Sequence, residues 1–446
     1  MTYRHVDLLR VEAFGRTVGA VGAASARGSY AFQYDPAWVR SGIELSPLLM
    51  PLAQARAPFT FPGLNRETFY DLPPMIADSL PDAFGNGIVD AVLAREGVSP
   101  DRVTALDRLA YVGARGMGAL TFTPDHSPRD LPTSLEMNDL VEAARRAVQG
   151  DLASPDTRTE ALNHLLAVGT SAGGARAKAV IAWNRTTGEM MAGGIQAPRG
   201  SEGRGFENRG FEQWLLKFDG VGADRQLGTG VEYGRTEYAY SLMAREAGID
   251  MARTELLEEG GRAHFVTRRF DRPGTEGERL HMQTLCGIGG LDFNAVGVND
   301  YASYFATMAS LGIGDREEAF RRVVFNVLAS NNDDHTKNLS FLMGADGAWR
   351  LAPAYDVTFA YSPTSPWVSR HLMSVEGKFE HITTADLEVL GDRAGVAGYR
   401  DIIVRVADAV ARFGAFADAA GLSSGRRLEI AERLELVRSE AAGDTA

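Results

Sequence analysis

Cysteine is almost absent from this chain of 446 residues, in which Cys286 stands alone. A single cysteine excludes an internal disulfide and a Cys-x-x-Cys metal site. Long apolar runs are also absent, since no stretch approaches the roughly 20 apolar residues that a membrane-spanning helix needs. The N-terminus, MTYRHVDLLRVEAFG, has no apolar signal core. The sequence therefore predicts a cytoplasmic protein that makes no contact with a membrane.

Basic residues are fewer than acidic residues in this chain. The chain has 46 Lys and Arg residues against 58 Asp and Glu residues, which gives a formal net charge of −12. Non-specific binding to nucleic acid requires basic side chains that neutralise phosphates, so this balance argues against broad nucleic-acid binding by the chain itself. We expect any contact with DNA to be indirect and to be made by a basic partner.

The rest of the composition is that of an ordinary globular protein, with 45% apolar and 23% charged residues. The length suits two or three domains rather than one core. A segment rich in proline and charge, Thr123 to Pro132, indicates the first boundary, near residue 130. Residues 6–35 are expected to be β-rich, with glycines at the turns, namely Gly15, Gly19, Gly22 and Gly28.

The most informative segment is residues 331–338, which read Asn-Asn-Asp-Asp-His-Thr-Lys-Asn. Asp333 stands five positions before Asn338, which is the spacing of the protein-kinase catalytic loop, H-R-D-x-x-x-x-N. In that loop the Asp accepts the proton of the substrate hydroxyl and the Asn holds a magnesium ion, while a later Asp holds the metal that bridges the phosphates. Asp356 follows Asn338 by 18 residues and fits the third role.

The sequence around this loop supports the same interpretation. Residues 317–330 carry apolar side chains at the spacing of a helix with one buried face, namely Phe320, Val323, Val324, Val327 and Leu328. Residues 339–343 are apolar and predict a strand, Gly344–Gly347 predicts a turn, and residues 348–351 lead back. An Asp-x-x-x-x-Asn pair by itself occurs often by chance, so the helix–loop–hairpin context carries the prediction.

Candidate nucleotide-binding residues lie upstream of the loop. Gly173 and Gly174 precede a predicted strand and could present backbone N–H groups to phosphates, although no Walker A motif is present. A second predicted strand, residues 211–218, carries Lys217, and a predicted helix, residues 236–248, carries Glu237. In kinases a lysine binds the ATP phosphates and a glutamate holds that lysine. We select Lys217 and Glu237 for these roles, with Lys178 as the rival lysine.

The order of these parts is that of a two-lobed kinase. The sequence predicts an α+β protein with a two-lobed protein-kinase-like fold, a mixed α/β N-terminal subdomain and a helical C-terminal lobe. We place the N-terminal subdomain at residues 1–130, the small-lobe portion at residues 131–280 and the helical lobe at residues 281–440.

Seven segments together identify a family resemblance: Leu80–Gly85 (LPDAFG), Val112–Ala119 (VGARGMGA), Ser171–Lys178 (SAGGARAK), Glu237-Tyr238, Arg269–Arg272 (RFDR), Asp333–Asn338 (DDHTKN) and Pro353–Asp356 (PAYD). With them the chain resembles the HipA-like serine/threonine kinases, which are toxins of bacterial toxin–antitoxin systems. The resemblance covers most of the chain, and it is strongest in the last two segments.

The resemblance implies roles for residues near the reacting groups. It aligns Asp333 with the catalytic base and His335 with a histidine near the phosphates. It aligns Asn338 and Asp356 with the magnesium ligands, and Lys217 with the nucleotide-binding lysine. ATP and Mg²⁺ are therefore the expected cofactors.

The resemblance also implies a regulator and partners. Arg269 and Phe270 align with a segment that contacts adenine through its backbone, and Ser171 aligns with a serine that such kinases phosphorylate in themselves. Family members pair with a small helix-turn-helix antitoxin that binds operator DNA, and their known protein substrates include aminoacyl-tRNA synthetases. This chain departs from the family pattern in its glycine loop, where Gly173-Gly174-Ala175-Arg176 replaces a single Gly followed by Ala-Gln-Glu.

Two alternatives differ in class from a protein kinase toxin. One is a catalytically silent co-repressor that only binds a helix-turn-helix partner, and the combined presence of Asp333, Asn338 and Asp356 argues against it. The other is a kinase for a small molecule, which would not need a separate N-terminal subdomain.

Overall fold

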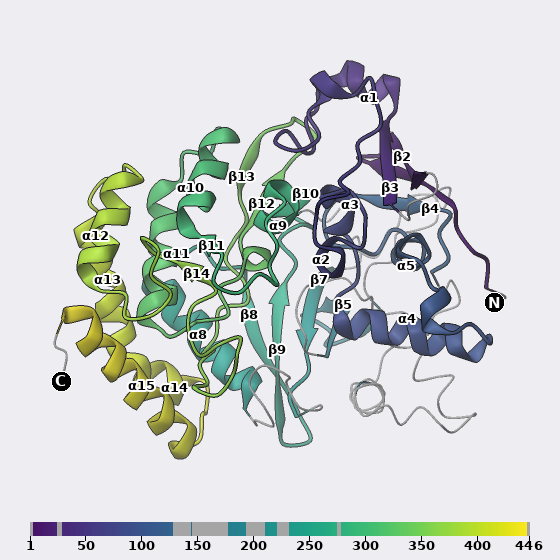
Figure 1. The fold of residues 1–446 in the computed structure, drawn as a ribbon. Helices are drawn as coiled ribbons and strands as arrows, with labels where there is room; N and C mark the ends of the chain where they lie inside the picture. The colour runs from purple at the N-terminus through teal and green to yellow at the C-terminus, as the bar shows by residue number, and fades with distance from the viewer. Residues whose placement is uncertain are drawn as a thin grey trace. The chain divides into compact units, whose positions relative to one another are not determined.

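The computed structural model describes residues 3–24, 29–127, 144, 177–192, 210–220, 232–273 and 278–443. The chain forms two compact units (Figure 1). The first unit comprises Met1–Gly222, Val266–Gly290 and Leu342–Ala348, and the second comprises Ala223–Phe265, Leu291–Phe341 and Trp349–Ala446. Helices and antiparallel sheets both occur, so the predicted α+β class is confirmed.

The first unit begins with a four-stranded sheet of order β3-β2-β1-β4, in which neighbouring strands are antiparallel. Its strands are β1 (Leu8–Ala13), β2 (Arg16–Ala24), β3 (Ser29–Tyr34) and β4 (Thr121–Thr123). Strand β1 buries alternate residues, Leu9, Val11 and Ala13, as the period of two in a strand requires. The β-rich prediction for residues 6–35 is confirmed for the described residues of this range.

The glycines of this sheet correct one expectation. Gly15 does lie in the β1–β2 turn, where Phe14 and Gly15 both have positive φ values (52° and 72°), as a type I′ hairpin turn requires. Gly19 and Gly22 instead lie within β2, so their assignment to turns was wrong. A Cβ atom on Gly19 would stand 2.2 Å from the Gln33 carbonyl oxygen. Close packing of the backbone, and not a turn, explains glycine at this position.

Six α-helices of the first unit lie within its described residues: α1 (Pro36–Ser41), α2 (Arg66–Phe69), α3 (Pro74–Ala77), α4 (Ala83–Arg95), α5 (Ala105–Val112) and α9 (Leu285–Gly289). Asp82 is the N-cap of helix α4, and its side chain accepts a hydrogen bond from the Gly85 N–H at 2.7 Å. Aspartate is a preferred N-cap because it satisfies an otherwise unpaired N–H of the first turn.

The second sheet of the first unit contains β5 (Lys178–Asn184), β6 (Met190–Ala192) and β7 (Phe211–Lys217) in the order β6-β5-β7. Strands β5 and β7 are antiparallel and pair from Lys178 opposite Lys217 to Asn184 opposite Phe211. Both strands were predicted, and both are confirmed. Strand β9 (Arg262–Arg268) ends in this unit, where the Arg269 N–H donates to the Gln213 carbonyl at 2.8 Å. Strand β10 (His281–Thr284) follows.

The second unit is mainly helical (teal to yellow in Figure 1), which agrees with the helical C-terminal lobe of the predicted fold. Its helices are α8 (Tyr233–Glu246), α10 (Tyr301–Ser310), α11 (Arg316–Leu328), α12 (Thr384–Arg393), α13 (Tyr399–Ala411), α14 (Phe413–Ala419) and α15 (Ser424–Ala442). Its short strands are β8 (Thr254–Glu259), β11 (Asn299–Asp300), β13 (Trp349–Leu351) and β14 (Met373–Ser374), and β12 (Ser340–Met343) begins in it. In the described part of the chain, no helix combines the length and the apolar character needed to cross a membrane.

Helix α11 is largely buried and leads into the predicted catalytic loop. The five apolar residues predicted to share its buried face are all buried, with at most 6% exposure. Tyr240 of α8 packs edge-on against Phe325 and donates a hydrogen bond to the Ala329 carbonyl at 2.8 Å. This bond satisfies a carbonyl at the C-terminal end of α11, where carbonyls lack partners within the helix. The end of α11 is therefore fixed in position by the core.

Candidate active site

The segment that follows α11 is held as a defined loop. Ser330 adopts a left-handed backbone conformation (φ 50°), which ends the helical path, and the Asn332 N–H donates to the Ala360 carbonyl at 3.1 Å. A short 3₁₀ turn, Thr336–Asn338, then leads into β12. The Asn338 side-chain amide donates to the Asp333 carbonyl oxygen at 2.8 Å, which closes the loop between the two residues of the predicted motif.

Asn338 and Asp356 line the same small cavity of about 20 Å³ in the second unit. This volume holds about one water-sized body. The structure thus brings together the two predicted metal ligands, which are 18 residues apart in the sequence. Asp356 has a positive φ of 53°, which is uncommon for a residue other than glycine and costs of order 1–3 kcal/mol. Such strain persists only where the surrounding structure imposes it.

Tyr355 explains how Asp356 is directed toward the loop. The predicted hairpin is present as β12, a turn closed by the Gly347 N–H and the Gly344 carbonyl, and β13. Beyond it, the Tyr355 hydroxyl donates to the Lys337 carbonyl and also contacts the Ser340 hydroxyl. The residue before Asp356 is therefore tied directly to the residue before Asn338.

Asn338 and Asp356, two of the twelve residues that line this cavity, have side chains of the type that binds magnesium. Carboxylate and amide oxygens are the hard ligands that Mg²⁺ prefers, and Mg²⁺ commonly takes one or two protein ligands beside phosphate oxygens and water. Within the described residues, no three His, Cys, Asp or Glu side chains gather as they would in a site built from protein ligands alone. Asn338 and Asp356 are of the residue types that bind Mg²⁺, and their role as metal ligands stays a prediction.

Asp333 and Asp334 are adjacent but have opposite environments. The Asp333 side chain is 25% exposed, and its carboxylate lies 3.8 Å from the Nε2 atom of His335. The Asp334 side chain is fully buried and accepts hydrogen bonds from the Tyr301 hydroxyl (2.7 Å), the Leu372 N–H (2.7 Å) and His371 Nδ1 (2.9 Å). The Asp333 side chain is therefore partly accessible to solvent, whereas the Asp334 side chain anchors the loop.

The Asp334 anchor extends into α11. Asn326 of this helix donates to the Tyr301 hydroxyl at 3.0 Å and accepts from the Asn331 amide at 2.9 Å. Burial and the Asp334 carboxylate raise the pKa of Tyr301 well above its usual value, so its hydroxyl stays protonated as a donor. Sequence reasoning missed these anchoring residues. The sequence pointed to these anchoring residues only through Asp334, the second acidic residue beside Asp333.

His335 lies in an environment that favours the neutral form of its imidazole. Its ring is buried and packs edge-on against Phe293, with 5.5 Å between ring centroids. Burial lowers the pKa of His335 to about 4, although the nearby Asp356 carboxylate acts in the opposite direction. The Lys337 ammonium also contacts this ring, at 4.4 Å from the Phe293 ring centre. His335 can thus serve as a hydrogen-bonding group but not as a fixed cation.

The predicted nucleotide-binding lysines lie in the first unit. Lys178 and Lys217 stand directly opposite one another on β5 and β7, and both are buried. The Lys178 ammonium forms an ion pair with Asp82, with 3.1 Å between Nζ and Oδ2. Glu237 is buried on α8 in the second unit. Its assignment as the partner of Lys217 therefore stays a prediction.

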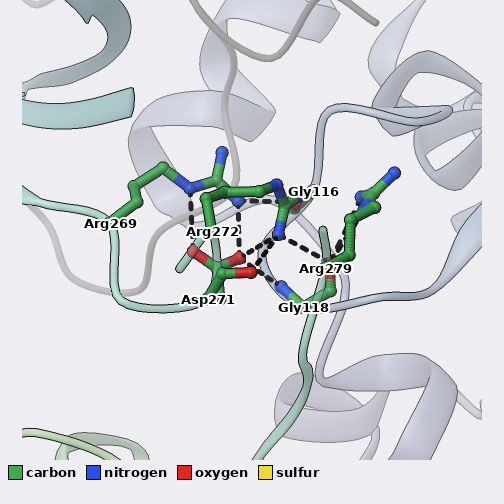
Figure 2. Close-up of polar contacts among 6 residues, drawn as sticks. All are labelled: Gly116, Gly118, Arg269, Asp271, Arg272 and Arg279. Carbon is green, nitrogen blue, oxygen red and sulfur yellow. Dashed lines mark hydrogen bonds and ion pairs between the residues drawn. The ribbon is translucent and has the colours of Figure 1, made fainter. Parts of the chain in front are cut away.

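The Arg269–Arg272 segment is held against a glycine-rich segment of the N-terminal part (Figure 2). Asp271 accepts two hydrogen bonds from Arg269 (3.0 and 2.7 Å), one from Arg272 (2.6 Å) and one from the Gly118 N–H (2.7 Å). The two arginines also donate to the Gly116 carbonyl, at 3.0 Å each. These arginines hold the pKa of the buried Asp271 far below its usual range against the effect of burial.

These contacts involve two of the three guanidinium nitrogens of Arg269. Its Nε and Nη2 atoms donate to Asp271, and Nη2 also donates to the Gly116 carbonyl. The contact of Arg269 and Phe270 with adenine stays a prediction. Ser171, Gly173 and Gly174 lie outside the described residues, as does most of the proposed boundary near residue 130.

Comparisons with known proteins give the family. A family model described as the HipA-like C-terminal domain matches residues 170–423, and one described as the HipA N-terminal domain matches residues 9–123. A Haemophilus influenzae protein named "Putative kinase" is 27% identical over 135 residues, covering 27% of this chain and 39% of that protein. A Sinorhizobium fredii protein named "Putative kinase Y4mE" is 29% identical over 180 residues, covering 35% of this chain and 39% of that protein. Each match thus spans about two fifths of the relative's length.

A solved structure has the same fold. It is the toxin–antitoxin complex of HipA, HipB and operator DNA from Shewanella oneidensis, with a TM-score of 0.62, 16% identity and coverage of 97% of this chain and 96% of that chain. The family model for the C-terminal domain alone covers more than half of the chain. The resemblance seen in the sequence is confirmed, and this chain belongs to the HipA-like protein family.

Proposed function

We propose that this protein is an ATP- and magnesium-dependent protein serine/threonine kinase that acts as the toxin of a toxin–antitoxin pair. One observation carries the proposal. Asn338 and Asp356 share a cavity, and the loop that holds Asn338 also presents the part-exposed Asp333. These are the residue types and the order that phosphoryl transfer requires.

Each residue has a definite task in this proposal. Asp333 accepts the proton of the attacking serine or threonine hydroxyl, for which its carboxylate must be reachable from solvent. Asn338 and Asp356 would hold Mg²⁺, which neutralises charge on the transferred phosphate when it is bound. Lys217 and Lys178 supply positive charge for the other phosphates. Since phosphoryl transfer needs positioning more than covalent help, a rigid loop anchored by Asp334 serves it well.

His335 contributes as a neutral group in this scheme. A buried neutral imidazole beside the phosphates can donate one hydrogen bond without adding a full charge. A protonated, cationic His335 could also bind phosphate. The position of His335 in the sequence does not distinguish between these two roles.

Partners and regulation follow from the family. The Shewanella oneidensis complex contains HipB and operator DNA, and we propose a small helix-turn-helix antitoxin as the partner of this chain. The net charge of −12 supports DNA contact through that partner. We further propose a cellular protein as substrate, an aminoacyl-tRNA synthetase being one candidate, autophosphorylation at Ser171 and a nucleotide phosphate contact at Gly173-Gly174. The division at residues 130 and 280 remains part of the proposal.

A direct experiment tests the activity. The purified chain is incubated with ATP and Mg²⁺, with and without a chelator, and phosphorylated residues are identified by mass spectrometry. Magnesium-dependent phosphoserine or phosphothreonine in the chain or in an added cell extract is the expected result. Phosphorylation of small molecules alone would favour the small-molecule kinase, and no phosphate transfer at all would favour the silent co-repressor.

A further inference from the structure

A buried ion pair joins the two domains that the family models recognise. Asp82 belongs to the N-terminal match, residues 9–123, and Lys178 to the C-terminal match, residues 170–423. Their charged atoms lie 3.1 Å apart, and their side chains are only 4% and 3% exposed. Charged groups at this depth are stable only when they are paired, so each of the two requires the other.

The pair lies beside a second lysine. Lys178 and Lys217 are directly opposite on antiparallel strands, so their side chains leave the same face of the sheet about 5 Å apart at Cβ. Like charges in such positions destabilise a sheet. The Asp82 carboxylate beside the Lys178 ammonium reduces this repulsion.

Asp82 is fixed in place by the helix that it begins. Its Oδ1 atom accepts the Gly85 N–H at 2.7 Å as the N-cap of α4, while its Oδ2 atom faces Lys178. The two oxygens therefore have separate tasks. The capping task requires only an oxygen, which asparagine also supplies, whereas the task toward Lys178 requires a negative charge.

We propose that Asp82 is a positioning residue of the nucleotide site. It holds the Lys178 ammonium on the face of β5 and β7 that receives the phosphates of a nucleoside triphosphate. The N-terminal domain is thus a component of the nucleotide site and not an accessory to the kinase domain. This inference rests on the proposed kinase function.

The test uses Asp82→Asn, which keeps the cap and removes the charge. Its matched control is Asp90→Asn on the same helix, where the lost partner is Arg108 at 2.7 Å. Binding of Mg²⁺–ATP is measured by calorimetry, KM and kcat are measured with ATP as the varied substrate, and folding is checked by thermal unfolding. We expect Asp82→Asn to raise the Kd and the KM for ATP about 10-fold, a loss typical of one charged contact, with little change in kcat.

Three comparisons make the result specific. Asp90→Asn should bind ATP like the wild type, and Asp82→Glu should recover part of the affinity. Lys178→Met should weaken binding as much as Asp82→Asn, and the double variant should be no weaker than either, since both remove one interaction. Unchanged or tighter ATP binding by Asp82→Asn would overturn the proposal, as would equal losses in Asp82→Asn and Asp90→Asn. A wild-type protein that binds no Mg²⁺–ATP would instead refute the proposed kinase function itself.

Discussion

The two adjacent aspartates of the catalytic loop should fail in different ways when each is replaced by asparagine. Asp334→Asn places an NH₂ group where the Tyr301 hydroxyl and His371 now donate, so both bonds to a buried carboxylate are lost. A hydrogen bond to a charged group contributes about 1.5–3 kcal/mol. For two such bonds we therefore expect a loss of about 3–6 kcal/mol in the free energy of unfolding.

Asp333→Asn should leave the fold intact. Its side chain is 25% exposed, and the loop-closing hydrogen bond from Asn338 uses the Asp333 backbone carbonyl, which the substitution does not change. The loss in unfolding free energy should stay within about 0.5 kcal/mol, as for most surface substitutions. The rate of phosphate transfer should fall about 100-fold or more, as for the loss of a general base.

Thermal unfolding and a phosphate-transfer assay on both variants separate the two roles. Asp334→Asn should lower the melting temperature by about 10 °C. At a temperature where both variants are folded, its rate should fall much less than that of Asp333→Asn. A melting temperature of Asp334→Asn equal to that of the wild type would refute the anchoring role. A larger rate loss in Asp334→Asn than in Asp333→Asn would show that Asp334 is the base.

Three further predictions concern the metal, the regulatory serine and pH. Asn338→Ala should abolish magnesium-dependent phosphate transfer with normal circular dichroism, and full activity would contradict its role as a ligand. Incubation with ATP and Mg²⁺ should give one dominant phosphosite at Ser171, identified by mass spectrometry. Nucleotide binding should weaken afterwards, because the added phosphate carries a charge of about −1.5 to −2 and repels the phosphates of ATP. A dominant phosphosite elsewhere would indicate different regulation. The His335 pKa is lowered from 6.5 to about 4, so the unfolded chain binds more protons between these values and stability falls on acidification. Denaturant titrations at pH 7 and pH 5 should therefore show a loss about 2 kcal/mol smaller in His335→Gln than in the wild type, and equal losses would contradict a buried neutral imidazole.

The sequence predicted the parts of the site that depend on local spacing. Asp333 and Asn338 are linked by a hydrogen bond within one loop, and the strand, turn and return strand that lead to Asp356 are all present. Hydrophobic periodicity also located α11, because a helix that buries one face must repeat its apolar residues every three or four positions.

The parts that sequence reasoning missed depend on distant contacts. Asp334 is anchored by Tyr301 and His371, which are 33 and 37 residues away, and no local pattern connects them. Asp82 reaches Lys178 across 96 residues, so only the fold reveals the pair. The glycine at position 19 was misassigned to a turn because its true cause, a neighbouring backbone that leaves no room for a Cβ atom, is not visible in sequence.

The rate at which Asp356→Asn transfers the γ-phosphate of ATP to protein tests most directly whether Asp356 holds the catalytic metal ion. Asp346→Asn is the matched control, since Asp346 lies exposed in the hairpin turn. We predict that Asp356→Asn is inactive at any magnesium concentration. Asp346→Asn should keep the wild-type rate, and both variants should unfold at the wild-type temperature. Magnesium-dependent phosphate transfer by Asp356→Asn at the rate of Asp346→Asn would contradict the assignment of this cavity as the catalytic metal site.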